Sequence, residues 1–406
     1  MTLGLNQPVA GLLRTLGQIC HQAVPAGLRQ ALLCTTVLSI SMLVSAPLFA
    51  DGGADWQPTP LSLTIGDSAG QRWIASVDGD EIGLNLLQHN RPDHSTRAVV
   101  LHLPGTHMNG QSQFQIDDQA HNLWLYLANR GIDVYSLDYR SHFIDADEDD
   151  LSAMAGWTME TYATDALRAL RWVQARHPDA PLFLAGFSRG AGLAYGTSCL
   201  AAEAGIDLTG LLALDGGFKR PDNDDVLDID AAREAWQAGE DWALDIGGSR
   251  GWLARQALMQ SVLDDAPDAR ETLQDVLYNA WGPGVLANPD TLSDTAALAA
   301  LMITYDRYYP SVQNLDARAL AATADAEHSS LDDCWGSMQI PVMAVIAGRF
   351  AALQPGGRYS AEASGSDDVS VLMLDDYGHL DILVGREAPD RVFTPILNWI
   401  KERTDH

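Results

Sequence analysis

The sequence predicts an α/β protein with a mostly parallel central sheet that helices cover on both faces. Three observations lead to this prediction. Short apolar runs alternate with amphipathic segments, an apolar run leads directly into a glycine-flanked serine, and one long helical stretch interrupts the alternation. Strands that alternate with helices need crossover connections, which place successive strands parallel. The 406 residues, 47% of them hydrophobic, suffice for one large domain with an insertion.

The first part of the predicted core spans residues 61–216, after a linker at 51–60 that contains proline and glycine. The segment 162–175 has apolar residues at three- and four-residue spacing, which is typical of a helix with one buried face. A further helical stretch is expected at 122–128. The predicted strands, read as short apolar runs, are 61–65, 71–77, 82–87, 98–103, 132–137, 181–185 and 211–214.

A helical cap, or lid, is predicted at 217–339, inserted between strands 6 and 7 of the core. Its apolar residues recur at helical spacing, and the stretch contains several tryptophans. An insertion at this place would lie above the carboxyl ends of the strands, where parallel sheets bind ligands. The second part of the core is then 340–406, with strands at 340–346 and 369–374 and a closing helix. The cap helices are expected at 231–242, 252–262, 269–281 and 296–305.

The N-terminal 50 residues have the layout of a secretory signal peptide. Arg14 and Arg29 precede the apolar run 31–44, and the sequence SAPLFA then leads to Asp51. We expect a cut after Ala50 and a periplasmic or secreted mature protein. The alternative is an uncleaved anchor, since 31–49 is nearly long enough to span a bilayer.

The net charge of −29 argues against some classes of partner. Such a surface repels phosphate backbones and anionic lipid headgroups, so we expect no nucleic acid and no stable membrane partner after signal cleavage. The cysteines and histidines do not form a C-x-x-C motif or a cluster at metal-ligand spacing, so no metal is expected. After export, Cys199 and Cys334 would remain, either as a disulfide or as two buried free thiols.

The central motif is Gly186-Phe187-Ser188-Arg189-Gly190, which follows the predicted strand 181–185. Glycines on both sides of a serine allow the sharp strand-to-helix turn on which a nucleophile is exposed, because a Cβ there would collide with neighbouring chain. The small residues Ala191 and Gly192 would let the next helix approach closely. We therefore interpret Ser188 as a nucleophile and Gly186 and Gly190 as its elbow.

Here the sequence resembles the α/β-hydrolase superfamily, over residues 61 to about 403. The resemblance implies an oxyanion hole formed by the backbone N–H groups of Arg189 and of Thr106, in the loop 103–110. The superfamily loop usually begins with His-Gly, whereas here Leu103 and Pro104 precede the glycine. It implies no cofactor.

The resemblance places the general base after the last strand, where His379 stands in the loop following 369–374. The string HLDILVGREAP is similar to the segment around the catalytic histidine of acid lipases and related esterases. We expect His379 to take the proton from Ser188 and to return it to the leaving group. His142 and His177 are expected on the surface.

The acidic member of a triad has no residue at its usual position, because 341–361 contains neither Asp nor Glu, and Phe350 falls about where the acid is expected. One alternative is Asp215, at the end of strand 211–214. A second is the polar loop with Glu362, Asp367 and Asp368. The third is a Ser–His pair that a carbonyl group or a water orients.

Together these observations predict an exported serine hydrolase that cleaves carboxylic esters with an apolar part, through an acyl-enzyme on Ser188. Its substrate would be a small-molecule or lipid-like ester. Two alternatives stay open. One is a peptidase or amidase of the same fold, and the other is a catalytically inactive protein of this fold that binds an apolar ligand or a partner.

Overall fold

The computed structural model describes residues 54–404, except 61–62, 91–94, 222–226, 240 and 327–328. The predicted signal peptide, its cut after Ala50 and the alternative membrane anchor lie outside the described residues. Among the helices of the described part, none is long and apolar enough to cross a membrane.

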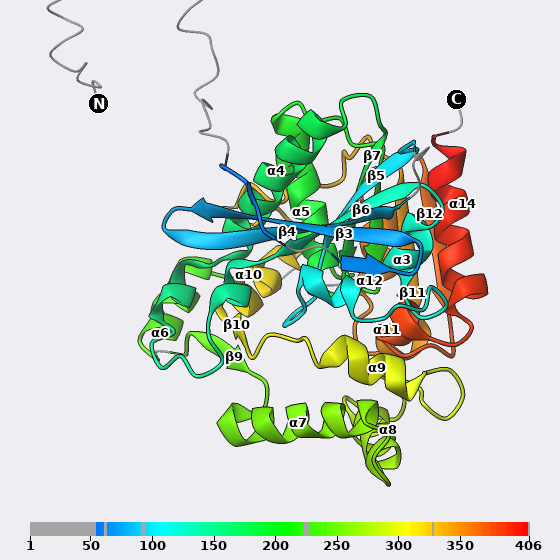
Figure 1. Ribbon diagram of the computed structural model, residues 1–406. Helices are drawn as coiled ribbons and strands as arrows, with labels where there is room; N and C mark the ends of the chain where they lie inside the picture. Colours follow the sequence, from blue (N-terminus) through cyan, green and yellow to red (C-terminus); the bar gives the residue numbers. More distant parts are fainter. Residues whose placement is uncertain are drawn as a thin grey trace, which may run out of the picture. The chain divides into compact units, whose positions relative to one another are not determined.

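A ten-stranded sheet forms the centre of the molecule (Figure 1). The six strands β6-β5-β7-β8-β11-β12 are parallel, and β1 to β4 add an antiparallel edge beside β6. The predicted α/β class is thereby confirmed. The strands are β1 (Gln57–Pro58), β2 (Leu63–Ile65), β3 (Ser68–Val77), β4 (Asp80–His89), β5 (Ala98–Leu103), β6 (Ile132–Asp138), β7 (Leu182–Phe187), β8 (Gly210–Leu214), β11 (Val342–Ala347) and β12 (Val369–Leu374).

Helices cover both faces of the sheet, and the strand side chains alternate between them. On β5, Ala98 and Val100 join one apolar cluster, whereas Val99 and Leu101 join the other. This two-residue period is what a strand buried on both faces requires. The first cluster lies under α3 (Leu123–Ala128) and α14 (Thr394–Glu402), and the second lies under α4 (Met159–Arg176) and α5 (Arg189–Glu203).

The chain between β8 and β11 forms an insertion, and Figure 1 shows α7 and α8 at its far end from the sheet, with α9 between. The prediction that this stretch is almost wholly helical was incomplete. The segments β9 and β10 pair as an antiparallel ladder, and three-residue strands are too short to show a period. The elements are α6 (Ile229–Gln237), β9 (Ala243–Asp245), α7 (Gly248–Leu263), α8 (Ala269–Asn279), α9 (Thr295–Met302), β10 (Tyr308–Pro310) and α10 (Val312–Leu320).

Candidate active site

Ser188 lies on a strained turn between β7 and α5. Its backbone has φ 56° and ψ −121°, a conformation that residues other than glycine rarely adopt. Main-chain contacts hold the turn, since the Ser188 N–H donates to the Leu214 carbonyl over 2.8 Å. A Cβ on Gly186 would lie 2.0 Å from the Gly190 oxygen, and one on Gly190 would lie 2.0 Å from the Leu103 oxygen. Both flanking glycines are therefore required by close backbone packing.

Asp215 directly follows β8 and is hydrogen-bonded to His379. The His379 Nδ1 lies 2.6 Å from the Asp215 Oδ2, and both side chains are buried. The second carboxylate oxygen accepts from the Ala347 N–H over 2.8 Å, which fixes the carboxylate plane. Burial raises the pKa of Asp215 above its usual range, and the bonds from His379 and Ala347 act against this rise.

The other acids considered for this role are engaged elsewhere or carry no bond to His379 within the described chain. Glu362 accepts from Arg358 at 2.7 Å, and Asp368 pairs with Arg403. No hydrogen bond or ion pair joins Asp367 to His379 in the described part of the chain. Of the three alternatives for the acid, the structure brings only Asp215 to the histidine. Asp381 accepts from the Gly378 N–H over 2.8 Å and so fixes the loop that carries His379.

Aromatic rings enclose the His379 imidazole. Phe187 stacks on it with a centroid distance of 4.6 Å, and Phe350 approaches to 4.1 Å. Trp281, 59% exposed, lies 5.8 Å away by ring centroids. Phe350 follows β11, so a phenyl ring packs on the histidine where the superfamily acid was expected. No hydrogen bond joins the Ser188 Oγ to His379 in the described structure.

The loop that carries Thr106 packs against the serine. A Cβ on Gly105 would lie 3.0 Å from the Ser188 Cβ, and Thr106 shares a pocket with Ser188 and Arg189. The Tyr139 hydroxyl donates to the Pro104 carbonyl over 2.9 Å. The predicted oxyanion residues Thr106 and Arg189 thus lie beside the predicted nucleophile.

Asp306 of the insertion fixes the far half of this loop, and no sequence pattern predicts this role. The Asn109 amide donates to the Asp306 Oδ1 over 3.0 Å, and the Asp306 N–H donates to the His107 carbonyl over 2.7 Å. His142, expected on the surface, instead has its Nδ1 2.8 Å from the same carboxylate oxygen and its side chain 18% exposed. The residues of this cluster lie up to 199 positions apart, so no local pattern could reveal it.

A pocket of about 1050 Å³ opens beside the serine. Its lining includes the elbow at Ser188 and Arg189, the turn that begins at Asp215, the α10 face and the start of α12 (Gly356–Glu362). A pocket of this size accommodates a drug-sized or larger ligand. Within the described residues, no group of three metal-binding side chains occurs.

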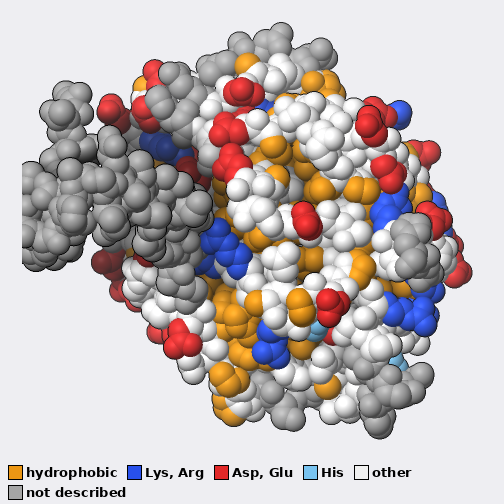
Figure 2. All heavy atoms as spheres, turned by 90° about the horizontal axis from the view of Figure 1, so that it is seen from above, with side chains coloured by type: hydrophobic (Ala, Val, Ile, Leu, Met, Phe, Trp, Pro, Cys, Tyr) orange, Lys and Arg blue, Asp and Glu red, His pale blue; other side chains and the backbone are white. Residues whose placement is uncertain are grey.

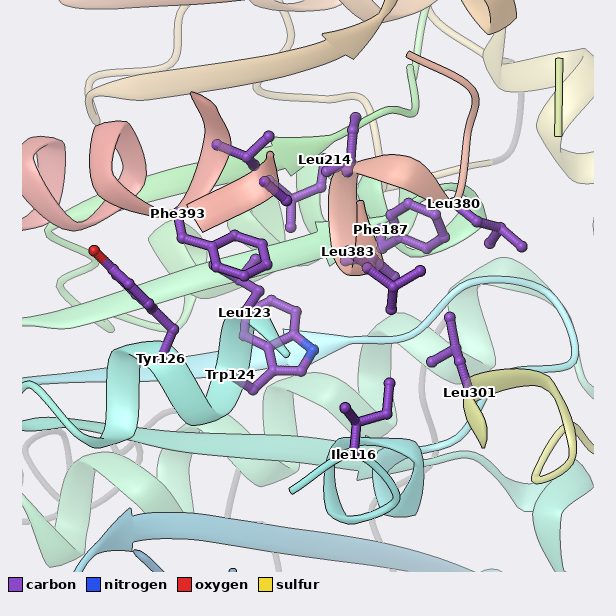
Figure 3. Close-up of a cluster of buried hydrophobic side chains, with 14 of the residues drawn as sticks. Ile116, Leu123, Trp124, Tyr126, Phe187, Leu214, Leu301, Leu380, Leu383 and Phe393 are labelled. Carbon is purple, nitrogen blue, oxygen red and sulfur yellow. The ribbon is translucent and has the colours of Figure 1, made fainter. Parts of the chain in front are cut away.

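One apolar cluster holds the neighbours of all three candidate catalytic residues (Figure 3). Phe187 precedes Ser188, Leu214 precedes Asp215 and Leu380 follows His379, and all three are buried in this cluster. Since a close-packed core permits little side-chain movement, the cluster fixes the backbone on which the three residues stand.

A disulfide joins Cys199 of α5 to Cys334 at the end of the insertion. It connects the helix that follows the elbow to a segment 135 positions further along the chain.

The similarity of this chain to known proteins is seen in the structure and not in the sequence. No family model and no curated protein matches the sequence. A Sulfolobus solfataricus protein provisionally described as a lipase has a TM-score of 0.67 and 22% identity, covering 86% of this chain and 99% of its own. A soluble variant of monoglyceride lipase from Saccharomyces cerevisiae, bound to a substrate analogue, has a TM-score of 0.54 and 12% identity, covering 85% and 99%. These structural similarities establish a shared fold. At identities this low, they assign no residue a role.

Proposed function

The chain has the α/β-hydrolase fold, and on that premise we propose that it is an exported serine hydrolase that cleaves carboxylic esters. The observation that carries this proposal is the hydrogen bond between His379 and Asp215, in a loop next to the elbow of Ser188. A buried carboxylate bound to the Nδ1 of a histidine sets its tautomer, leaving Nε2 to accept a proton.

In the proposed reaction, the Ser188 Oγ attacks the ester carbonyl while His379 Nε2 takes the hydroxyl proton. The imidazolium then gives that proton to the leaving alcohol, and an acyl group remains on Ser188. Water, deprotonated by the same imidazole, attacks the acyl-enzyme; the acyl–Oγ bond breaks, the carboxylic acid leaves, and the imidazolium returns the proton to the Ser188 oxygen. Asp215 stabilises the imidazolium in both halves without being protonated itself.

Two backbone N–H groups, those of Arg189 and Thr106, are proposed to stabilise the oxyanion that forms during each attack. Arg189 begins α5, so its N–H lies at the positive end of a 15-residue helix. Each such donor is worth about 3 to 4 kcal/mol to the transition state.

The absence of a Ser188–His379 hydrogen bond is compatible with catalysis, because such bonds are often long in empty sites and shorten with substrate. The same absence, with Phe350 packed on His379, is also what the inactive binding protein would show. That second candidate is therefore kept. The amidase or peptidase alternative uses the same residues and differs only in the leaving group.

A fluorophosphonate probe with peptide mapping separates these candidates. We expect the parent protein to be labelled on Ser188, Ser188→Ala to be unlabelled, and Asp215→Asn to react at least a hundredfold more slowly. Asp367→Asn is the matched control, because Asp367 does not contact His379. If the parent is not labelled while circular dichroism shows it folded, the hydrolase proposal fails and the binding protein remains. Matched 4-nitrophenyl ester and anilide substrates then decide between esterase and amidase.

Export is proposed from the N-terminal sequence and is supported by the disulfide, since disulfides persist mainly in oxidising compartments. N-terminal sequencing of protein recovered from the periplasm or medium should begin at Asp51. Recovery of the uncut chain in membranes would favour the anchor instead.

A further inference from the structure

The pocket beside Ser188 is basic, although the chain as a whole is strongly acidic. The net charge is −29, and Figure 2 shows Asp and Glu side chains spread over the face it draws. The pocket lining nevertheless contains Arg189, Arg220, Arg318 and Lys219, with Asp215 as the only carboxylate among the described lining residues. A concave surface lined by one sign of charge raises the local concentration of the opposite ion.

Two of these five charged groups are already neutralised by close partners. Lys219 is fully buried, and its Nζ lies 2.5 Å from the Asp332 Oδ2. Asp215 is bound to His379. The charge that faces the pocket therefore comes from the three arginines.

The three arginines have no carboxylate partner within 4.0 Å among the described residues. Arg189 donates to the Asn314 Oδ1 over 2.7 Å, and Arg220 donates to the Gln354 side chain. Neutral amides do not neutralise a guanidinium charge, and Asp316, whose charge acts on Arg189, is itself paired with Arg233 over 2.7 Å. The segment 222–226, which contains three aspartates, lies outside the described residues.

Arg189 directly follows the proposed nucleophile Ser188 in the chain and lines the same pocket. Its Nε is buried and has no hydrogen-bond partner in the described structure. Burial, with a smaller contribution from the nearby Arg220, lowers the pKa of Arg189, while Tyr309 and Asp316 act against this shift. A buried donor without an acceptor is unfavourable unless a ligand accepts its hydrogen bond.

We propose that Arg189, Arg220 and Arg318 form a subsite for an anionic group of the ester substrate, a carboxylate or a phosphate. The inference rests on the proposed function and specifies its substrate class. Guanidinium groups bind both anions through paired N–H donors. Phe218, Ile346 and Phe350 line the same pocket, so they would contact the apolar part of such an ester. The hydrolysis itself is unchanged: the acyl–oxygen bond breaks, and water supplies the hydroxyl and the proton.

The test compares kcat/KM for matched esters on the full mature protein. One pair is the mono-4-nitrophenyl ester of suberic acid and its counterpart with a terminal carboxamide, which places the anion on the acyl side. The other pair places a phosphate on the alcohol side, against the same ester with a free hydroxyl. We expect one anionic ester to be preferred roughly ten- to hundred-fold at low salt, with the preference falling as salt rises.

Arg220→Gln and Arg318→Gln should each lower the ratio of anionic to neutral kcat/KM several-fold, and Arg189→Gln should lower it most. Arg270→Gln on α8, an exposed arginine outside the pocket lining, is the control and should leave the ratio unchanged. If Ser188 is labelled and the neutral esters are cleaved with no preference for either anion, the subsite is overturned and the hydrolase stands. If nothing is cleaved and Ser188 is not labelled, the proposed function fails, and the subsite with it.

Discussion

Stability is expected to fall above neutral pH because of His142, which connects the core to the insertion. Its Nδ1 lies 2.8 Å from the Asp306 Oδ1, and its Nε2 lies 3.9 Å from the Asp138 Oδ2. Burial lowers the pKa of His142, but the two carboxylates outweigh burial and the opposing charge of Arg72, so that the pKa rises from 6.5 to about 9. The imidazolium is thus the favoured form in the folded protein.

The direction in which stability changes with pH follows from comparing the pKa of His142 in the folded and unfolded states. The folded pKa is the higher one, so the contribution is fully present below 6.5 and is lost as pH rises through about 9. At about 1.4 kcal/mol per pKa unit, the largest contribution is roughly 3 kcal/mol. Burial also raises the pKa of Asp306, and by the same linkage a raised carboxyl pKa lowers stability as pH rises, so it does not reduce the loss. We therefore expect a net loss of about 1 to 3 kcal/mol in the free energy of unfolding.

The assay is urea unfolding at pH 6, 7.5 and 9.5, for the parent and for His142→Gln. The parent should lose stability across this range, and the variant should lose markedly less. His121→Gln is the matched control, because the ion pair of His121 is with Asp118, three residues away, at the surface. Equal losses in the parent and in His142→Gln would refute the reasoning.

Because Asp306 also accepts a hydrogen bond from Asn109, ester hydrolysis by Asp306→Asn should show a lower kcat with little change in KM.

Three further outcomes follow from the packing. Gly190→Ala should abolish fluorophosphonate labelling, because its Cβ would meet a carbonyl oxygen at 2.0 Å, whereas Gly251→Ala, with no atom within 4 Å, should label normally. Lys219→Met should lower the free energy of unfolding by about 3 to 5 kcal/mol, since it leaves the buried carboxylate of Asp332 unpaired. Adding Asp332→Leu to this variant should restore most of the loss, as measured by denaturant titration. Cys199→Ser should lower the unfolding midpoint by the equivalent of about 2 to 5 kcal/mol; an unchanged midpoint in calorimetry would contradict this expectation.

The elbow and the strands of the sheet could be predicted from the sequence because both depend on local patterns. The glycines around Ser188 and the apolar strand before it are adjacent in the chain, and β12 occupies the predicted residues 369–374. The partner of His379 stayed open among several acids, because 164 positions separate it from Asp215 and only the folded sheet brings them together. The Asp306 cluster and the pairing of β9 with β10 went unpredicted for the same reason.

The Cys199–Cys334 bond closes a covalent ring within the chain. Asp215 and nearly all of the insertion belong to this ring, while Ser188 and His379 lie on the two arms outside it. A protease that nicks the insertion once would therefore open the ring without releasing a fragment. The cut protein would migrate as two pieces only after reduction, and it would still carry every residue of the candidate triad on one molecule.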